Sequence, residues 1–555
     1  MTTPSYTEDL TDIATGDEAS GWTEFGSPFN TQGAPAYEDN EYPYIQGNYA
    51  VTQDCTKTGL GSLGYDYGST ISLTTDGAFF VWQNFSSPFV LDDYAGTTSG
   101  YAGVMIIVGN DTSNFSYWDV GGSDVFPNPY GGFDCGVVNT TVTAAGSVGT
   151  KTIDRYVGGA VYVTSGPGKG EPHQVDVMRF GRGSAIFQYG EVGDYCTIAG
   201  FAAQNDLQAN RWGLIQEFPG GYLWQGRMQL GTSSNACYFT DSNVTVFIKY
   251  TPQVTSNFNT VEFSNASSEI NMTAFNFICL DPSGTASKGR WITTNDATVN
   301  LLNCSFQDMA TFTFDSNTTV DTCTFLRCGQ IDPGAGDLSF SSVRQSTVTG
   351  GGSAGGGALL WNDSSDPNTQ LNDMTFTIGA GSHHAIEFGT SAPQTINLTN
   401  MTFTGFSASN QQTTSVLYFP DTGSDVTWTV NHTGTSGTIS YYKARTGDTV
   451  TISSSVPITI TVKDTDGNLI SGVQTAVYLT TDTTYTSPIM NEDTVAGVAS
   501  ENYTGSTPAD VVVRCRKASG GGTKYKNYSS TQAIGTGGLT LTVTITEDPN
   551  NNATT

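Results

Sequence analysis

The sequence has few charged residues, few basic residues among them, and few segments with the composition of a helix. Only 13% of its 555 residues are charged, and 21 basic residues stand against 51 acidic ones, which gives a formal net charge of −30. A surface of that sign repels nucleic acid and anionic membranes, so neither is expected as a partner. Because apolar residues at helical spacing are rare and alternating runs such as residues 540–545 are common, we predict an all-β chain.

Long apolar segments are also missing. The longest run, residues 104–108, is far too short to span a bilayer. The first residues lack the basic and apolar regions of a secretory signal. We therefore expect a chain that is made in the cytosol, stays soluble and inserts into no membrane.

Strong catalytic and metal-binding motifs are lacking. Neither the P-loop nor the zinc signature H-E-x-x-H occurs, and the chain has only four histidines. His383 and His384 are adjacent, and neighbouring side chains of a strand point to opposite faces, so they are not expected to bind one ion. We assign no catalytic residue, no metal ligand and no cofactor, and a non-enzymatic role is favoured.

Carboxylates keep one enzymatic alternative open. A glycoside hydrolase needs two carboxylates about 5 to 10 Å apart. The central part of the chain supplies acidic residues for such a pair: Asp308, Asp315, Asp321, Asp337 and Glu387. Because acidic residues are frequent throughout the chain, their presence alone does not distinguish a polysaccharide-cleaving enzyme from a structural protein.

The sequence does contain a short repeated phrase, a polar residue and a small residue before Phe or Val, between residues 257 and 418. Its terminal apolar residues are spaced by 29, 19, 23, 28 and 27 positions: Phe277, Phe306, Phe325, Val348, Phe376 and Phe403. A period of about 20 to 30 residues built from short strands is typical of a parallel β-solenoid. We predict a right-handed parallel β-helix over residues 251–445, with these residues stacked as a core ladder. Hairpins of a sandwich with coincidental spacing are the alternative.

Asparagine and cysteine occupy particular positions in this phrase. Asn303 and Asn400 open two of its copies, so we expect them to stack as an amide ladder at a corner between strands. Cys304 and Cys323 fill the small position, which predicts buried reduced thiols. The nine cysteines are odd in number and widely spaced, which argues against a secreted disulfide framework.

Two further domains flank the predicted β-helix, and an arm precedes them. Residues 1–48 are acidic with little core of their own and are expected to pack on the same domain or on neighbouring subunits. Residues 49–250 alternate long strands with Gly- and Asp-rich turns, which predicts a jelly-roll or lectin-like sandwich. Residues 446–555 predict an Ig-like sandwich. Its turn at Asp464, Asp466 and Asn468 lacks the Glu of an EF-hand, so we expect a plain turn there.

Aromatic residues of the predicted lectin-like sandwich are the candidate binding residues. A concave sheet can present Trp and Tyr rings for stacking on sugars. The candidates for carbohydrate contact are Trp82, Trp118, Tyr130, Trp212 and Trp224. Since most Trp residues of a two-layer sandwich belong to its core, the competing interpretation of each ring is structural.

Taken together, these features resemble those of the structural proteins of marine tailed bacteriophages. The resemblance rests on the repeats, the Gly- and aromatic-rich block 219–226, the phrase 327–331 and the turn 464–472. It implies a virion protein that is assembled in the host cytoplasm in contact with other virion proteins, and it transfers no functional residue. We expect a homotrimeric tail fibre or spike that attaches to host-surface glycans. A capsid decoration protein that stabilises the shell and a polysaccharide depolymerase on the β-helix are the alternatives.

Overall fold

The computed structural model divides the chain into two compact units. Unit 1 comprises Met1–Gly336 and Arg344–Ala354, and unit 2 comprises Asp337–Val343 and Gly355–Thr555. The described residues are 2–35, 37–39, 45–85, 103–121, 133–164, 171–207, 214–218, 220–249, 251, 253–280, 289–293, 297–345, 356–379, 382–420, 422–504, 508–517, 522–535 and 537–552. Almost every element in them is a β-strand, which confirms the all-β prediction.

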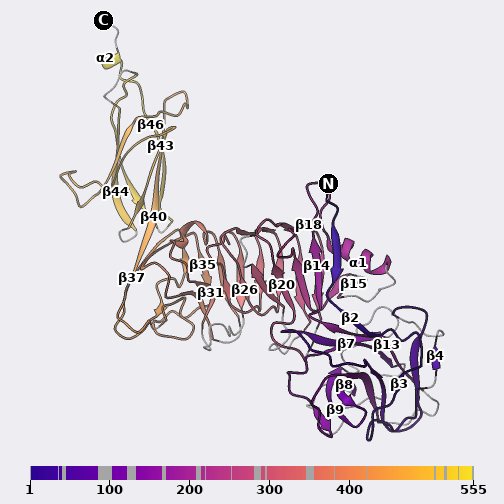
Figure 1. Ribbon diagram of the computed structural model, residues 1–555. Coiled ribbons are helices and arrows are strands. Elements are labelled where there is room, and N and C mark those ends of the chain that lie inside the picture. The colour runs from indigo at the N-terminus through magenta and orange to yellow at the C-terminus, as the bar shows by residue number, and fades with distance from the viewer. Residues whose placement is uncertain are drawn as a thin grey trace. The chain divides into compact units, whose positions relative to one another are not determined.

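Unit 1 begins with two antiparallel sheets that pack face to face (Figure 1). The first has the order β10-β7-β13-β5-β4, with β2 also beside β13: Phe133–Val138, Ala78–Phe85, Glu171–Gly181, Ala50–Cys55, Tyr37–Asp39 and Thr11–Ala14. The second has the order β11-β9-β8-β12-β6-β3: Gly146–Val148, Asn114–Gly121, Val104–Asp111, Tyr156–Val163, Gly59–Asp66 and Trp22–Thr23. Val81 and Met178 of the first sheet share a buried cluster with Ile106 and Trp118 of the second, so the inner faces form one core.

Three N-terminal strands belong to this sandwich, in agreement with the expectation that residues 1–48 pack on their own part of the chain. Strands β2, β3 and β4 pair with β13, β6 and β5. Phe25 and Phe29 are fully buried in a cluster with Met105 and Ile107, so they cover the outer face of the second sheet. A strand covered on both faces is apolar at consecutive positions, as β8 is. The boundary predicted at residue 48 therefore separates no structural parts.

After β13 the chain winds into coils of three short strands, which stack into parallel sheets as in a parallel β-helix. In unit 1 the first sheet contains β14, β17, β20, β23, β26 and β29: Ser184–Gln188, Arg227–Leu230, Thr260–Phe263, Arg290–Thr293, Phe312–Thr313 and Ile331–Asp332. The second contains β18, β21, β24 and β27: Tyr238–Ser242, Glu269–Thr273, Thr298–Leu302 and Thr318–Asp321. The third contains β16, β19, β22, β25 and β28: Gly221–Trp224, Thr245–Ile248, Asn276–Cys279, Ser305–Gln307 and Thr324–Leu326.

The coils begin well before the predicted boundary at residue 251. Strand β14 already pairs in parallel with β17, and β1 (Ser5–Glu8) pairs antiparallel with β14 and covers its other edge. The first coil also holds β15 (Ile215–Phe218), which pairs antiparallel with β16, and the helix α1 (Ile198–Leu207). The sequence pattern does not predict this helix. Its residue Phe201 stacks on Phe187 with ring centroids 5.0 Å apart, so an apolar contact and not helical periodicity anchors it.

The apolar residues of the repeated phrase stack on one another within each unit. Phe277, Phe306 and Phe325 are register partners on β22, β25 and β28, and their ring centroids are 5.6 and 5.1 Å apart. Phe376 and Phe403 pair in the same way on β32 (Thr375–Ile378) and β35 (Thr402–Thr404), at 5.5 Å. All five are buried. Val348 lies outside the described residues.

Each phrase opens at a corner with left-handed backbone. The residues at this corner have φ between 53° and 57°: Ala274, Asn303, Thr322, Asp373 and Asn400. Small polar residues tolerate this conformation better than others, which accounts for the Asn and Asp of the pattern. Among the described residues of the coils, Asn side chains pair at other positions, between Asn271 and Asn300 at 2.9 Å and between Asn397 and Asn431 at 3.0 Å.

Unit 2 contains further coils and a second sandwich, whose strands are antiparallel except for the parallel pair β40 (Thr449–Lys463) and β46 (Leu539–Thr544). One parallel sheet contains β31, β33, β36 and β39: Gly357–Trp361, His384–Phe388, Leu417–Tyr418 and Tyr442–Lys443. Another contains the parallel strands β34, β37 and β40: Thr395–Thr399, Thr427–Thr433 and Thr449–Lys463. In the third, β38 (Ser436–Gly437) lies beside β35. Strand β40 serves both parts, because its first half pairs with β37 and its second half with β43 (Val498–Tyr503) and β46 (Leu539–Thr544). The predicted boundary at residue 446 falls just before this shared strand.

The other sheet of the C-terminal sandwich has the order β42-β41-β44-β45. Its strands are Met490–Asp493, Gln474–Leu479, Ala509–Arg516 and Tyr528–Ile534. The core includes Val462, Ile470, Val473 and Val477, the four positions to which the alternating pattern assigns inward side chains.

Candidate ligand-binding cleft

The aromatic residues predicted to contact carbohydrate are buried where the structure describes them. Trp82, Trp118 and Trp224 are 1%, 2% and 0% exposed, so they present no ring face to a ligand. Trp118 donates its indole N–H to the Val142 carbonyl at 3.0 Å, which is a core contact. Tyr130 and Trp212 lie outside the described residues.

The carboxylates considered for polysaccharide cleavage are engaged by their neighbours. Arg327 donates two hydrogen bonds to Asp308, at 2.9 and 2.7 Å. Two of the other four accept from threonine hydroxyls, Asp315 from Thr318 at 3.1 Å and Asp321 from Thr322 at 2.7 Å. The remaining two accept from backbone N–H groups, Asp337 from Ser339 at 3.0 Å and Glu387 from Gly357 at 2.9 Å. These bonds stabilise turns and corners.

The histidine pair is held by backbone carbonyls. Nδ1 of His383 lies 3.0 Å from the His384 carbonyl oxygen, and Nδ1 of His384 lies 2.6 Å from that of Ser415. Burial lowers the pKa of His384 to about 4, so its ring is neutral near pH 7. Within the described part of the chain, no group of three or more His, Cys, Asp or Glu side chains is arranged to hold a metal ion.

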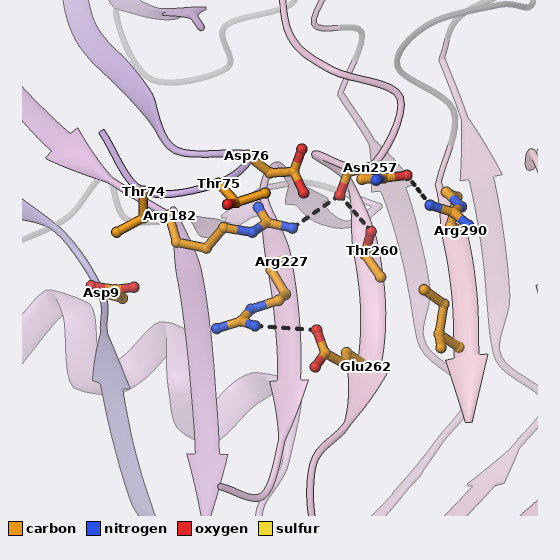
Figure 2. Close-up of a pocket in the computed structure, with 11 residues that line it drawn as sticks. Asp9, Thr74, Thr75, Asp76, Arg182, Arg227, Asn257, Thr260, Glu262 and Arg290 are labelled. Carbon is orange, nitrogen blue, oxygen red and sulfur yellow. Dashed lines mark hydrogen bonds and ion pairs between the residues drawn. The ribbon is translucent and has the colours of Figure 1, made fainter. Parts of the chain in front are cut away.

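A cleft of about 490 Å³ opens in unit 1, where the loop before β7 meets the first coils (Figure 2). The lining residues are Asp9, Thr74, Thr75, Asp76, Arg182, Arg227, Asn257, Thr260, Glu262, Arg290 and Ile292. Most of them are polar, and Arg227, Thr260 and Arg290 are aligned because the register of β17, β20 and β23 places them opposite one another. The parallel sheet thus places residues that are far apart in the sequence in one row across neighbouring strands.

Arg182 is partly buried in this cleft without a carboxylate partner among the described residues. Its Nη1 donates to the Phe258 carbonyl at 3.1 Å and its Nη2 to that of Asn257 at 2.9 Å, while the guanidinium lies 5.8 Å from the Phe258 ring centroid. Burial, with the positive charge of Arg227 beside it, lowers the pKa of Arg182 to about 10. The side chain is therefore still a cation near pH 7, and its charge is not neutralised by direct contact.

The other two arginines differ in their partners. Arg227 donates to Ser184 Oγ at 2.8 Å and forms an ion pair with Glu262 at 3.1 Å. Arg290 donates to the side-chain oxygen of Asn257 and, at 3.4 Å, to the Thr311 hydroxyl. Asn257 therefore lies between Arg182 and Arg290, accepting from one with its backbone oxygen and from the other with its amide oxygen, as the dashed lines of Figure 2 show.

Two carboxylates of the cleft face it from outside the coils. Asp76 adopts a left-handed backbone with φ of 58° and accepts a 2.6 Å hydrogen bond from the Thr255 hydroxyl. Asp9 follows β1 and is held through its backbone, which bonds to Ser184 and Gly183. Both carboxylates retain free acceptor capacity, since a carboxylate accepts about four hydrogen bonds.

Comparisons with known proteins give no family. No family model matches the chain, and no curated protein is similar to it. Among solved structures, the chain is similar to the catalytic domain of a GH87 α-1,3-glucanase in complex with nigerose, with a TM-score of 0.18 and 10% identity over 81% of this chain and 85% of that one. A variant of the same domain with nigerose gives the same TM-score, identity and coverage.

The side chains that line the cleft determine what it can bind. Three arginines supply donors in a planar fork that suits carboxylate and sulfate groups. The carboxylates of Asp9, Asp76 and Glu262 can accept hydrogen bonds from the hydroxyl groups of a ligand, and so can the hydroxyls of Thr74 and Thr75 in the loop before β7. No helix among the described residues has the length and apolar character to cross a membrane.

No pattern in the sequence brings the cleft residues together. The three arginines are separated by 45 and 63 positions, and none of them belongs to the repeated phrase. The missing signal is the register of the first coils, which aligns Ser184, Arg227, Thr260 and Arg290 across four strands. An alignment of the strands that begin at 184, 227, 260 and 290 would have revealed it.

Proposed function

We propose that the chain is a surface protein of a bacteriophage particle, a tail fibre or spike that attaches the particle to glycans on its host. In this proposal the sandwich of unit 1 is a lectin-like jelly roll, the coils form a right-handed β-helix, and the C-terminal sandwich is Ig-like. Stacked coils supply a stiff support. A net charge of −30 limits non-specific adhesion to other acidic surfaces.

The observation that carries the proposal is the polar cleft of about 490 Å³ beside the first coils. A cleft of this size accommodates a small ligand. Arg227, Thr260 and Arg290 are held on neighbouring strands of one sheet, which keeps their geometry constant. Sugars are recognised by such sets of converging polar groups, so the cleft is a candidate for glycan binding.

The N-terminal residues favour attachment over capsid decoration. We expect a decoration protein to reach its coat protein with a free arm, whereas β1 to β4 pair with strands of the chain itself. Polysaccharide cleavage is the second candidate function, because Asp9, Asp76 and Glu262 line the same cleft.

The test uses particles that contain the chain and the purified full-length chain. Gold-labelled antibodies against the chain are expected to mark the tail in electron micrographs, and the immobilised chain is expected to retain host-surface glycans unchanged. Labelling of the capsid shell alone, or failure to retain any glycan, contradicts attachment. Release of new reducing ends from the glycans would identify a depolymerase instead. Light scattering tests the proposed homotrimer, because one chain has a mass of 58.7 kDa.

A further inference from the structure

The cleft concentrates cationic side chains in a chain that has few of them. It contains three of the eleven arginines, Arg182, Arg227 and Arg290, although the formal net charge is −30. Of these three, only Arg227 has a carboxylate partner among the described residues. A partly buried cation is normally paired, because desolvation of a charge is unfavourable. Arg182 and Arg290 can therefore each pair with an anionic group of a ligand.

The geometry indicates where that group lies. Asn257 accepts hydrogen bonds from both Arg182 and Arg290 and so holds the two guanidinium groups on either side of itself. Each guanidinium has five N–H donors. Arg182 uses its two terminal nitrogens for backbone carbonyls, and Arg290 uses Nε and Nη1, which leaves donors on both residues for a ligand.

The carboxylates of the cleft decide what kind of anion fits. A plain inorganic anion would be repelled by Asp9 and Asp76, and a metal ion would be repelled by the arginines. A molecule that carries both an acidic group and hydroxyl donors can pair with the arginines and also donate to the carboxylates of the cleft. An acidic sugar has this combination, because its carboxylate or sulfate accepts from guanidinium groups while its hydroxyls donate to Asp carboxylates.

We infer that the cleft binds an acidic saccharide, whose carboxylate or sulfate contacts Arg182 and Arg290 and whose hydroxyls contact Asp9 and Asp76. This inference rests on the proposed function, since it names the class of glycan that the same cleft recognises. Arg227 is a positioning residue in this arrangement, because its ion pair with Glu262 fixes the place of that carboxylate in the cleft.

The experiment measures binding of the full-length chain by calorimetry to three matched probes. They are a uronic acid hexasaccharide, the same hexasaccharide with its carboxyl groups reduced to alcohols, and a sulfated hexasaccharide. The unreduced uronate or the sulfated probe is expected to bind at least about tenfold more tightly than the reduced one. Whichever of the two binds more tightly identifies the acidic group.

Variants then locate the site. Arg182→Gln and Arg290→Gln are each expected to weaken binding of the acidic probe at least about tenfold, and Arg182→Lys to weaken it less, because Lys keeps the charge and loses the planar fork. Arg155→Gln is the matched control, since Arg155 is bound to Asp66 on the sandwich and does not line the cleft. Thermal unfolding of each variant checks that it is folded. Should Arg182→Gln not fold, Arg290→Gln carries the test.

The outcomes separate the inference from the proposed function. Equal binding of the acidic and reduced probes overturns the inference while leaving glycan attachment in place. Equal weakening by Arg155→Gln also overturns it, because the effect would then come from overall charge. Inorganic sulfate that binds as tightly as the sulfated saccharide overturns the assignment of a sugar. Failure of all three probes and of host-surface glycans to bind overturns both.

Discussion

The carboxyl of Asp176 lies inside the sandwich of unit 1, in contact with the N-terminal residues. It accepts hydrogen bonds from the backbone N–H groups of Ile45 and Gln46. Burial raises its pKa to about 8, and these two hydrogen bonds only partly oppose the increase. In the unfolded chain the same group titrates near its ordinary pKa of about 3.9. Between these two values the folded chain binds more protons than the unfolded chain, so raising the pH lowers its stability.

Asp176→Asn removes this titration and keeps an oxygen that can accept from the two backbone N–H groups. We expect the variant to gain stability relative to the parent as the pH rises from 5 to 8, by about 2 kcal/mol or more, and the difference to level off above pH 8. Urea unfolding at several pH values measures it. Asp111→Asn is the control, because Asp111 has a lowered pKa and no titration in this range. A difference between variant and parent that does not change with pH would contradict the assignment.

Thr322 occupies the left-handed corner of a coil, where a β-branched side chain is strained. Its φ is 54°, equal to that of Asn303 at the same corner of the preceding coil. Glycine adopts this conformation without steric penalty. We expect Thr322→Gly to raise the free energy of unfolding by about 0.5 to 1 kcal/mol, after subtraction of the extra entropy of glycine in the unfolded chain.

Thr324, two residues later, provides the matched control. It lies in the extended strand β28, where glycine loses entropy and gains nothing. Thr324→Gly is expected to lower the free energy of unfolding by about 0.5 to 1 kcal/mol. Opposite signs for the two substitutions in thermal or urea unfolding are the decisive result. If both destabilise, the corner is not strained by threonine.

The phenylalanine ladder is the main packing feature of the coils in unit 1. Phe306 lies between Phe277 and Phe325 with nearly parallel rings, at interplanar angles of 7° and 16°. Trp291 and Phe312 contact the same ring edge-on at 5.7 and 5.1 Å. Removal of the Phe306 ring therefore leaves a cavity between Phe277 and Phe325, and this cavity cannot close unless strands move.

We expect Phe306→Ala to lower the free energy of unfolding by about 3 to 5 kcal/mol. Leu302→Ala is the control on the same coil, because Leu302 is 41% exposed, and it is expected to change stability by less than about 1 kcal/mol. Chemical unfolding of both variants measures the difference. Similar effects for Phe306 and Leu302 would show that the stacked rings contribute little.

The elements that the sequence predicts well are those with a local pattern. Phe and a preceding small residue recur at a solenoid period, and the strands that carry them are found in the structure. In the first coils the positions equivalent to this Phe ladder are Tyr222 on β16 and Val246 on β19, so no phenylalanine of the phrase marks them. The sequence pattern therefore places β14, β16, β17 and β19, which lie before residue 251, in the sandwich, although they belong to the coils. Pairings across long sequence distance, such as β1 with β14, leave no periodic signal at all.

The residues of the cleft, like the long-range strand pairings, leave no local pattern in the sequence. The cleft residues come from the loop before β7, from the segments after β1 and β13, from the turn before β20 and from β17, β20 and β23. No short motif contains any two of its arginines. Of the aromatic candidates, Trp82, Trp118 and Trp224 are core residues, because burial of a large ring contributes more stability than exposure of it.

At the scale of the whole molecule, the dominant property is the excess of acidic side chains. The chain has 51 acidic and 21 basic residues, and several of the basic ones are already paired in the structure, among them Arg155 with Asp66 and Lys249 with Asp134. Most acidic groups therefore repel one another across the surface. Such repulsion opposes the compact state and is reduced by salt, since the screening length falls from about 30 Å at 0.01 M to about 8 Å at 0.15 M.

We expect the melting temperature to rise by about 2 °C or more when sodium chloride is increased from roughly 0.01 to 0.2 M, because screening removes repulsion that the few ion pairs do not offset. Differential scanning calorimetry of the full chain measures this shift. Potassium chloride at the same ionic strength is the control and should give the same shift, since screening does not depend on the identity of the monovalent cation. A melting temperature that falls with salt would mean that the local ion pairs outweigh the repulsion of the excess carboxylates. A shift confined to one cation would instead indicate a specific binding site for it.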